Sequence, residues 1–425
     1  MPSFDLIIKG GHVIDAANNV DSLMDVGVAG RVVGAVEANI PESQGRRVID
    51  ATGMWVTPGL IDIHAHCTGF SGAMFPEEMC FPYGVTTMVD CGGSGWRTFD
   101  AFNRDVIQKS AVRVFALLNI VGQGMEGDVE QDIDDMDAEL TAAKIRQRSD
   151  ILVGVKVAHF GGRGWESIDR GVEAARLSGS FCLVDQNSKP TRPFDEMLER
   201  LRPGDGTTHC FGYGKPMIGN DGKVKQSYID ARARGVKFDV GHGNNSFSFS
   251  MAKPALDQGF PPDTISTDMH RMSLHTSRAQ MTEVMSKFLA MGMPMQEVIA
   301  RSTWEPAKWI NHTEIGTLTP GASADISVLE FQDRPSGLSD SGPTGYRIMQ
   351  ADGRLINQLT IKDGVVKFDY DGLSKDDWSA TPETDLDIPC LLYTSPSPRD
   401  ATLSRLAGYA CKKKGGGGGG GGGGG

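Results

Sequence analysis

The sequence predicts a (β/α)8 barrel of the TIM type with a small β-sandwich domain beside it. Three observations lead to this fold class. From Val56 onward, short apolar segments alternate with longer segments whose apolar residues recur at three- and four-residue steps, as in strands followed by helices. The apolar segments number eight, which is the count that closes a parallel barrel. Residues 1–55 and 314–372 instead carry short β-type runs between Gly, Asn and Asp, and are expected to build the small β-sandwich together.

The predicted barrel occupies residues 56–313. Its eight strands are, in chain order, LIDIHAH, VTTMVDC, AVRVFALL, ILVGVKVA, SFCLVD, GTTHCF, VKFDVG and DTISTD. Helical periodicity is clear between them at residues 133–143 and 194–201. A doubly wound open sheet shows the same alternation but fits this number of strands less well.

Composition narrows the class of protein. The chain has 425 residues, of which 39% are apolar and 23% charged, as in an ordinary globular enzyme. Its formal net charge of −12 argues against nucleic acid or an anionic membrane as partner, and leaves a small molecule. No apolar run is long enough to span a bilayer. The seven cysteines form no CxxC pair, which predicts reduced thiols and a cytoplasmic location.

The end of the chain differs from the rest in composition. Residues 373–389 are expected to be a C-terminal extension, and residues 390–425 a non-native or disordered tail. Three lysines followed by eleven glycines are what a run of A and then a run of G would encode. A genuine flexible glycine tail is the alternative.

Polar residues stand at the carboxyl ends of the barrel strands, where the active sites of such barrels lie. His64 and His66 end the first strand and are two residues apart, so both side chains point to one face. Later strands end in Lys156, Asp185 with Gln186, His209, His242 and Asp268. Imidazoles, a lysine and carboxylates at one rim indicate a metal site. Each has a structural alternative, because an Asp can cap the next helix and His242 can brace its glycine-rich loop.

Loop residues supply candidates for substrate binding. Trp96 and Tyr213, together with His242, are predicted to contact the substrate, although packing within the loops is the alternative for each. The remaining histidines off the strand ends are expected to be structural; they are His12, His270, His275 and His312.

As a set, these motifs resemble the amidohydrolase superfamily, and are most similar to its dihydroorotase-like amidohydrolases and deacetylases, which are metallohydrolases. The resemblance rests on TPGLIDIHAH, GVKV, THCF, ISTD and GTLTPGASADISVLE, and runs from about Phe4 to Trp378. It implies a site for two Zn2+ ions. It further implies roles for five residues: His64, His66 and Asp268 as ligands of the more buried metal, Lys156 as a carbamate formed with carbon dioxide that bridges both metals, and His209 as a ligand of the second metal.

The fifth strand departs from the family pattern. The resemblance places a second-metal histidine there, but this chain has none between His159 and His209. The position falls on Asp185 or Gln186. Asp185 can replace the histidine as a carboxylate ligand, or the second metal is weak or absent, so two Zn2+ ions or one are both open.

The resemblance implies hydrolysis of an amide or ester bond in a small molecule, by a deacetylase or a cyclic-amide hydrolase. A metal-bound hydroxide would attack the carbonyl, with Asp268 as general base and then general acid. The alternative is a non-catalytic barrel of this family used for binding or assembly. A homo-oligomer is compatible with the resemblance, because barrels of this family often pair.

Overall fold

The computed structural model describes residues 2–342 and 347–380. The chain divides into two units, Met1–Ser374 and Lys375–Gly425, and both β-sheets lie in the first. The predicted tail at residues 390–425 and most of the extension before it lie outside the described residues. Within the described ranges, no helix combines the length and the apolarity needed to cross a membrane.

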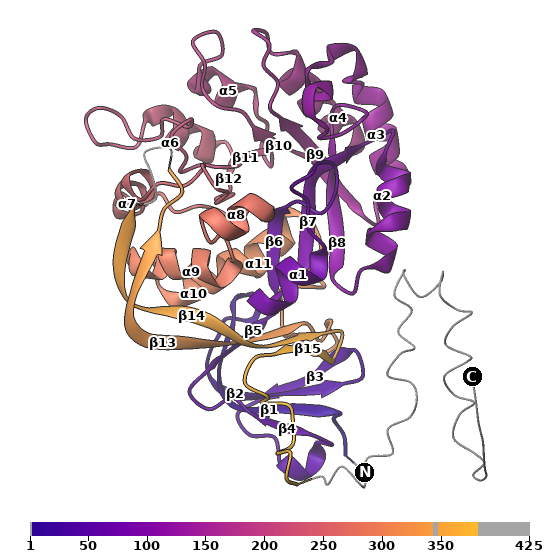
Figure 1. The fold of residues 1–425 in the computed structure, drawn as a ribbon, viewed down its shortest axis with the longest axis vertical. Helices are drawn as coiled ribbons and strands as arrows, with labels where there is room; N and C mark the ends of the chain where they lie inside the picture. Colours follow the sequence, from indigo (N-terminus) through magenta and orange to yellow (C-terminus); the bar gives the residue numbers. More distant parts are fainter. Residues whose placement is uncertain (1, 343–346, 381–425) are drawn as a thin grey trace, which may run out of the picture. The chain divides into compact units, whose positions relative to one another are not determined.

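The barrel sheet contains seven parallel strands that curl around a common interior (Figure 1). In sheet order they run without a break from β12 to β6. Their bounds are β6 (Leu60–Ala65), β7 (Val85–Gly95), β8 (Arg113–Asn119), β9 (Leu152–Ala158), β10 (Phe181–Asp185), β11 (Gly206–Thr207) and β12 (Lys237–Phe238). Every residue of β6, β7, β9 and β10 is buried, as expected for parallel strands covered on both faces. The first seven predicted strands are thus confirmed, although β11 and β12 are shorter than predicted.

The predicted eighth strand does not form a continuous ladder. Residues 263–269 make isolated parallel bridges to Asp239 on one side and to Ala65 of β6 on the other. The backbone of this segment nevertheless bonds to both neighbours: the amides of Val240 and His242 donate to it on one side, and its Asp268 amide donates to the carbonyl of His64 on the other. Its hydroxyl groups add hydrogen bonds to the buried carboxylates of Asp239 and Asp62.

Helices follow the barrel strands. Those with assigned α-helical bounds are α1 (Pro76–Cys80), α2 (Phe99–Asp105), α3 (Ala138–Gln147), α4 (Glu166–Ser178), α5 (Phe194–Arg200), α6 (Gln226–Ala233), α7 (Phe249–Asp257), α8 (Arg271–Thr276), α9 (Met281–Ala290), α10 (Met295–Ser302) and α11 (Trp304–Trp309). The predicted helix at residues 133–143 begins later than its periodicity suggests. Asp137 accepts a hydrogen bond from the Leu140 amide and so caps α3, while Ile133–Asp135 form a 3-10 turn.

The N- and C-terminal β segments join in one eight-stranded mixed sheet. Its strands are β1 (Leu6–Asp15), β2 (Val20–Ala29), β3 (Val32–Glu37), β4 (Val48–Asp50), β5 (Trp55–Pro58), β13 (Ile326–Ser339), β14 (Ile348–Lys362) and β15 (Val365–Asp369). The link between the two segments is the antiparallel pairing of β5 with β13, in which Pro58 lies opposite Ile326. In Figure 1 the indigo strands and the orange-to-yellow strands lie side by side at the lower end of the view. The division of this unit into two facing layers, as in a sandwich, stays a prediction.

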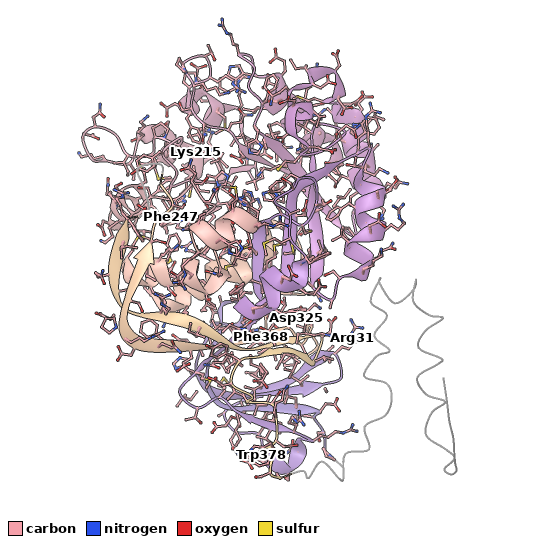
Figure 2. The ribbon with its side chains drawn as sticks, in the orientation of Figure 1. Arg31, Lys215, Phe247, Asp325, Phe368 and Trp378 are labelled. Carbon is pink, nitrogen blue, oxygen red and sulfur yellow. The ribbon has the colours of Figure 1, made fainter. Side chains whose placement is uncertain are left out.

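Two groups of contacts connect the second sheet to the barrel. At its near edge, the buried Asp325 pairs with Arg113 of β8 and with Lys362 of β14. Farther out, the β13–β14 hairpin reaches the loop around Phe247, which Figure 2 labels. There the Ser341 amide donates to the Phe247 carbonyl, and the Phe247 amide donates to the Ser341 hydroxyl. The Ser341 hydroxyl also donates to the backbone oxygen of His242, 3.0 Å away. The hairpin therefore supports a loop that follows β12.

We expect Phe288→Ala to destabilise the fold by about 3–5 kcal/mol, because this ring is fully buried and would leave a cavity. Phe288 packs against the rings of Phe211 and Phe247, at centroid distances of 6.2 and 5.9 Å. Urea unfolding measures the loss. Leu23→Ala is the control, since Leu23 is 67% exposed and its truncation should change the free energy of unfolding by less than about 0.5 kcal/mol. Equal losses in the two variants would contradict the assignment of Phe288 to the core.

Candidate functional site

His64, His66 and Asp268 meet at the carboxyl ends of the barrel strands. The Nε2 atoms of His66 and His64 lie 3.0 and 3.7 Å from Oδ1 of Asp268, and all three residues are buried. Atoms that share a tetrahedral Zn2+ at 2.0–2.2 Å are about 3.4 Å apart, so this spacing suits ligands of one ion. Nδ1 of His66 is buried without a hydrogen-bond partner among the described residues. The structure thus brings together the three residues that the sequence assigned to the first metal.

The hydrogen bonds of His64 determine which nitrogen faces this cluster. Thr208 donates its hydroxyl hydrogen to Oδ2 of Asp239 at 2.7 Å, which leaves the Thr208 oxygen to accept from Nδ1 of His64 at 2.8 Å. The unprotonated nitrogen is then Nε2, on the side of Asp268 and Lys156. Burial, together with the nearby Lys156, lowers the pKa of His64 to about 3, so the ring is neutral, as a metal ligand must be.

Asp268 is an ionised carboxylate held by its surroundings. Burial opposes its ionisation, but contacts with His270 and His66 hold its pKa well below the usual range. Its backbone lies in the left-handed region at φ 50°, and its amide donates to the carbonyl of His64. The carboxylate is therefore positioned both to bind a cation and to accept a proton.

Lys156 projects from β9 into the same interior and is fully buried. Its Nζ lies 3.2 Å from Nε2 of His64 and 3.8 Å from Oδ2 of Asp185. Burial acts to lower the pKa of Lys156, but Cys91 and the carboxylates of Asp185 and Asp268 raise it above its ordinary value. At this position the ammonium form of Lys156 therefore balances the nearby carboxylates.

Asp185, at the end of β10, faces His209. Nε2 of His209 lies 3.1 Å from Oδ2 of Asp185, while Nδ1 of His209 donates to the carbonyl of Gly241. Burial opposes ionisation of Asp185, but its contacts with His209 and Lys156 hold its pKa well below the usual range. Gln186, the other candidate for this position, does not line the cavity described below. Of Asp185 and Gln186, Asp185 is therefore the one that lines the cavity beside His209.

Gly241 and Gly243 allow the backbone after β12 to pass close to these side chains. A Cβ on Gly241 would lie 2.1 Å from Oγ1 of Thr208, and one on Gly243 would lie 2.5 Å from Oδ2 of Asp268. Both glycines also have positive φ, which other residues rarely adopt. The two glycines of the GHG sequence therefore allow Thr208 and Asp268 to lie against this backbone.

His242, between those glycines, is fully buried and does not line the cavity. Its Nδ1 lies 2.9 Å from the carbonyl of Gly243, and its Nε2 lies 2.8 Å from Nζ of Lys287. The ring stacks on Phe247 at a centroid distance of 4.9 Å. Because both ring nitrogens are engaged, this placement favours the alternative in which His242 braces the loop over the predicted contact with substrate.

The other two predicted substrate contacts also lie off the cavity. Trp96 is half-buried beneath the guanidinium of Arg97, which lies 4.1 Å from the ring centroid. The hydroxyl of Tyr213 accepts a hydrogen bond from Arg347 at 3.0 Å. Both aromatic rings thus take part in loop packing, the alternative weighed for each from the sequence.

A cavity of about 1030 Å3 opens onto the cluster. His66, Asp185, His209 and Asp268 form part of its wall, together with residues that follow other barrel strands and residues of α2. Ser94 belongs to this wall, and its buried hydroxyl has no hydrogen-bond partner among the described residues. A hydroxyl in that state is available to a polar group of a ligand.

Sequence reasoning missed His159, Glu130, His270 and Ser94. His159 follows Lys156 by three residues at the end of β9, and its Nε2 lies 3.6 Å from Oδ2 of Asp185. Its place at a strand end was a usable signal. His270 lines the cavity beside Asp268, with its Nδ1 2.8 Å from that residue's carbonyl oxygen. Glu130 had no signal of this kind, because it lies in a long connection after β8. Ser94, in β7, is a common residue type that does not by itself indicate a site.

The fold and this cluster together define a barrel enzyme with a candidate metal centre. Residues 248–367 match the sequence profile of the Amidohydrolase family. A deacetylase of Brucella anthropi is 32% identical over 304 residues, which span 69% of this chain and 75% of that protein. A deacetylase of Enterococcus faecalis is 28% identical over 348 residues, spanning 80% and 93%. The chain therefore belongs to the amidohydrolase family, as the sequence motifs indicated.

Solved structures agree with this assignment. A crystal structure of an adenine deaminase aligns with a TM-score of 0.79 at 29% identity, over 86% of this chain and all of that one. A crystal structure of a dihydroorotase aligns with a TM-score of 0.76 at 26% identity, over 85% and 98%. These likenesses support the TIM-like barrel and a hydrolytic enzyme.

We expect Thr208→Val to weaken Zn2+ binding about 10- to 100-fold, because the isosteric side chain no longer fixes the His64 tautomer. Competition with a chelator of known affinity measures the change. Thr207→Val is the matched control, since the hydroxyl of Thr207 bonds instead to the Val184 carbonyl. A loss of affinity equal in both variants would show that the Thr208 hydroxyl does not act through His64.

Proposed function

We propose that this chain hydrolyses an amide or ester bond in a small molecule, with Zn2+ held at the carboxyl ends of the barrel strands. The observation that carries the proposal is the buried cluster of His64, His66 and Asp268 in the wall of a cavity. Neutral imidazole and carboxylate are donors that suit zinc. The deacetylases among the relatives point to a deacetylase, and the dihydroorotase structure points to a cyclic-amide hydrolase as the nearest variant.

A Zn2+ ion at such a site lowers the pKa of bound water toward neutrality and polarises a carbonyl oxygen. Asp268 would accept the proton of the attacking water. It would then return that proton to the nitrogen or oxygen of the leaving group. Asp268 is ionised, as a proton acceptor must be, and its position at the cavity wall fits both roles. His64 and His66, whose Nε2 atoms face Asp268, would hold the ion beside it.

Lys156 is proposed to carry carbon dioxide as a carbamate. The ammonium would first lose one proton, its nitrogen would then form a bond to the carbon of carbon dioxide, and a second proton would leave that nitrogen, so that two protons pass to water. The product is an anion in place of an ammonium. Nζ lies 3.2 Å from Nε2 of His64 and 3.8 Å from Oδ2 of Asp185, so a carbamate there would supply oxygen ligands beside His64. Bound cations would then supply the positive charge that the ammonium gives up.

The location of the protein is proposed to be the cytoplasm, because the five cysteines among the described residues are all free and buried. A homo-oligomer remains a prediction from the resemblance. The non-catalytic alternative predicts that the purified chain binds no metal, so elemental analysis of zinc per chain separates it from the hydrolase.

Asp268→Asn is expected to lower kcat about 100- to 10,000-fold, because an amide cannot relay the proton. The assay is hydrolysis of N-acetyl and O-acetyl small acids, followed by cyclic amides. Zinc content and the thermal unfolding midpoint are measured on the same samples, so that loss of the ion or of the fold is recognised. Wild-type rates on a verified substrate would remove Asp268 from its assigned role.

Ser94→Ala should raise KM about 2- to 12-fold and change kcat little, since one hydrogen bond to substrate contributes about 0.5–1.5 kcal/mol. The matched control is Ser167→Ala in α4. Ser167 also has a buried hydroxyl without a partner among the described residues, but it lies outside the cavity wall. If KM is unchanged in Ser94→Ala, the substrate does not use this hydroxyl.

A further inference from the structure

We propose that Arg192 forms, with Gln186, a binding site for an oxyanion beside the substrate cavity. The oxyanion is a carboxylate or a phosphate group. Both residues lie in the loop that leads from β10 to α5 (Figure 1). The inference goes beyond the proposed function, because anion binding at this loop requires neither a metal ion nor hydrolysis.

The guanidinium of Arg192 is buried without a carboxylate partner. The residue is 3% exposed and forms no ion pair with any carboxylate of the described residues. Burial lowers the pKa of Arg192, and the charge of Glu166 opposes this effect from a distance. Because a guanidinium stays protonated in proteins, a positive charge is held in the interior. A buried cation is stabilised by an anion, so this position favours one.

The nitrogen donors of this loop are largely unsatisfied. Nη2 of Arg192 donates to the carbonyl of Phe160 at 2.5 Å, but Nε and Nη1 of Arg192 are buried without a hydrogen-bond partner in the part of the chain that the structure describes. Nε2 of Gln186 is in the same state. All of these atoms are donors, so they require an acceptor. Carboxylate and phosphate oxygens are the acceptors that arginine binds most strongly.

Gln186 and Arg192 lie in the wall of a small cavity. Asn187 and four large side chains complete that wall: Trp165, Ile168, Phe194 and Met197. No carboxylate of the described residues lines this cavity, and the space is too small to hold a water molecule. Water therefore does not satisfy the buried donors. The apolar part of the wall would also strengthen the attraction between the guanidinium and an anion, because the local dielectric constant is low.

Asn187 separates the small cavity from the substrate cavity. It is exposed and lies in the wall of both cavities. The residue before it is held in place, because the carbonyl of Gln186 accepts a hydrogen bond from Lys215, which Figure 2 labels. We expect rotation of the Asn187 side chain to open the donors of Arg192 toward the substrate cavity. An oxyanion would then enter from that side, as a free ion or as the acidic group of a substrate.

Lys189 adds a second positive charge to the same loop. The backbones of Lys189 and Arg192 exchange hydrogen bonds of 2.9 and 3.0 Å across a tight turn. Nζ of Lys189 lies 3.4 Å from the carbonyl oxygen of Phe160, to which Arg192 also donates. Burial, together with the charge of Arg192, lowers the pKa of Lys189. Two like charges are thus held close together, and an anion bound beside them would offset their repulsion.

The first test measures anion binding by the full chain. Inorganic phosphate and acetate are titrated into wild type, Arg192→Gln, Arg192→Lys and Arg234→Gln by isothermal calorimetry, at constant ionic strength and equal zinc content. Arg234 is the matched control, because it is exposed and also donates to a backbone carbonyl, that of Leu198. We expect Arg192→Gln to weaken phosphate binding about 10- to 100-fold and Arg192→Lys to weaken it less, since lysine keeps the charge. Arg234→Gln should bind phosphate as wild type does.

The second test identifies the source of the oxyanion. KM and kcat are measured for a verified acetylated acid and for the neutral amide of the same acid. If the substrate supplies the oxyanion, Arg192→Gln raises KM for the acid alone, and phosphate competes with the acid. If a free anion binds, phosphate binding still depends on Arg192, but the ratio of the two KM values is the same in wild type and variant. Either result supports the anion site.

Gln186→Met is a second variant, for the case that Arg192→Gln does not fold. It keeps the length of the side chain, removes the Nε2 donor, and should weaken phosphate binding about 2- to 12-fold. Equal dissociation constants in wild type and the folded variants, or no binding to any of them, together with an unchanged ratio of KM values, would overturn the anion site. Phosphate binding that depends on Arg192, without turnover of any acetylated substrate or cyclic amide, would overturn the proposed function alone.

Discussion

The buried carboxylate of Asp239 is the constraint on which both the barrel and the site depend. It is fully buried and accepts hydrogen bonds of 2.7–2.8 Å from the hydroxyls of Thr208, Thr264 and Ser266. Thr208 follows β11, whereas Thr264 and Ser266 lie in the segment that fills the gap between β12 and β6. Through Thr208 the same carboxylate selects the tautomer of His64. A buried anion that lost these donors would be costly, so closing the barrel and preparing the metal ligand are one energetic event.

The site itself is a problem of charge balance among buried groups. Asp185 and Asp268 are anionic, and Lys156 lies within reach of both. Lys215 pairs with the outer oxygen of Asp185. If Lys156 became a carbamate, the site would lose a positive charge and gain a negative one. Bound divalent cations would then balance the carboxylates in place of the ammonium. The nearby carboxylates of Asp185 and Asp268 are the reason that the ammonium of Lys156 can be buried at the centre of the site.

Much of the fold followed from local pattern, and the exceptions have physical causes. Apolar runs of β type were sufficient for the first seven strands of the barrel, because each is buried along its length. The eighth segment forms only isolated bridges, although its backbone bonds to both neighbours and the hydroxyls of Thr264, Ser266 and Thr267 bond to buried carboxylates. The helix near residue 138 begins where Asp137 can cap it, which periodicity alone does not locate. Hydrogen-bond partners distant in sequence hold the eighth segment in place, whereas a local cap decides where α3 begins.

The sequence by itself determined the kinds of donor at the strand ends and the order in which they arrive. It identified His64, His66, Lys156, His209 and Asp268, because strand ends in a parallel barrel share one rim whatever the loops do. Only the tertiary structure decided which side chains turn toward that rim. His242 turns away to Lys287, whereas His159 turns inward to Asp185 through a left-handed backbone and a bond to Glu130. The direction of a side chain depends on partners that are far apart in the chain, and these become neighbours only when the barrel closes.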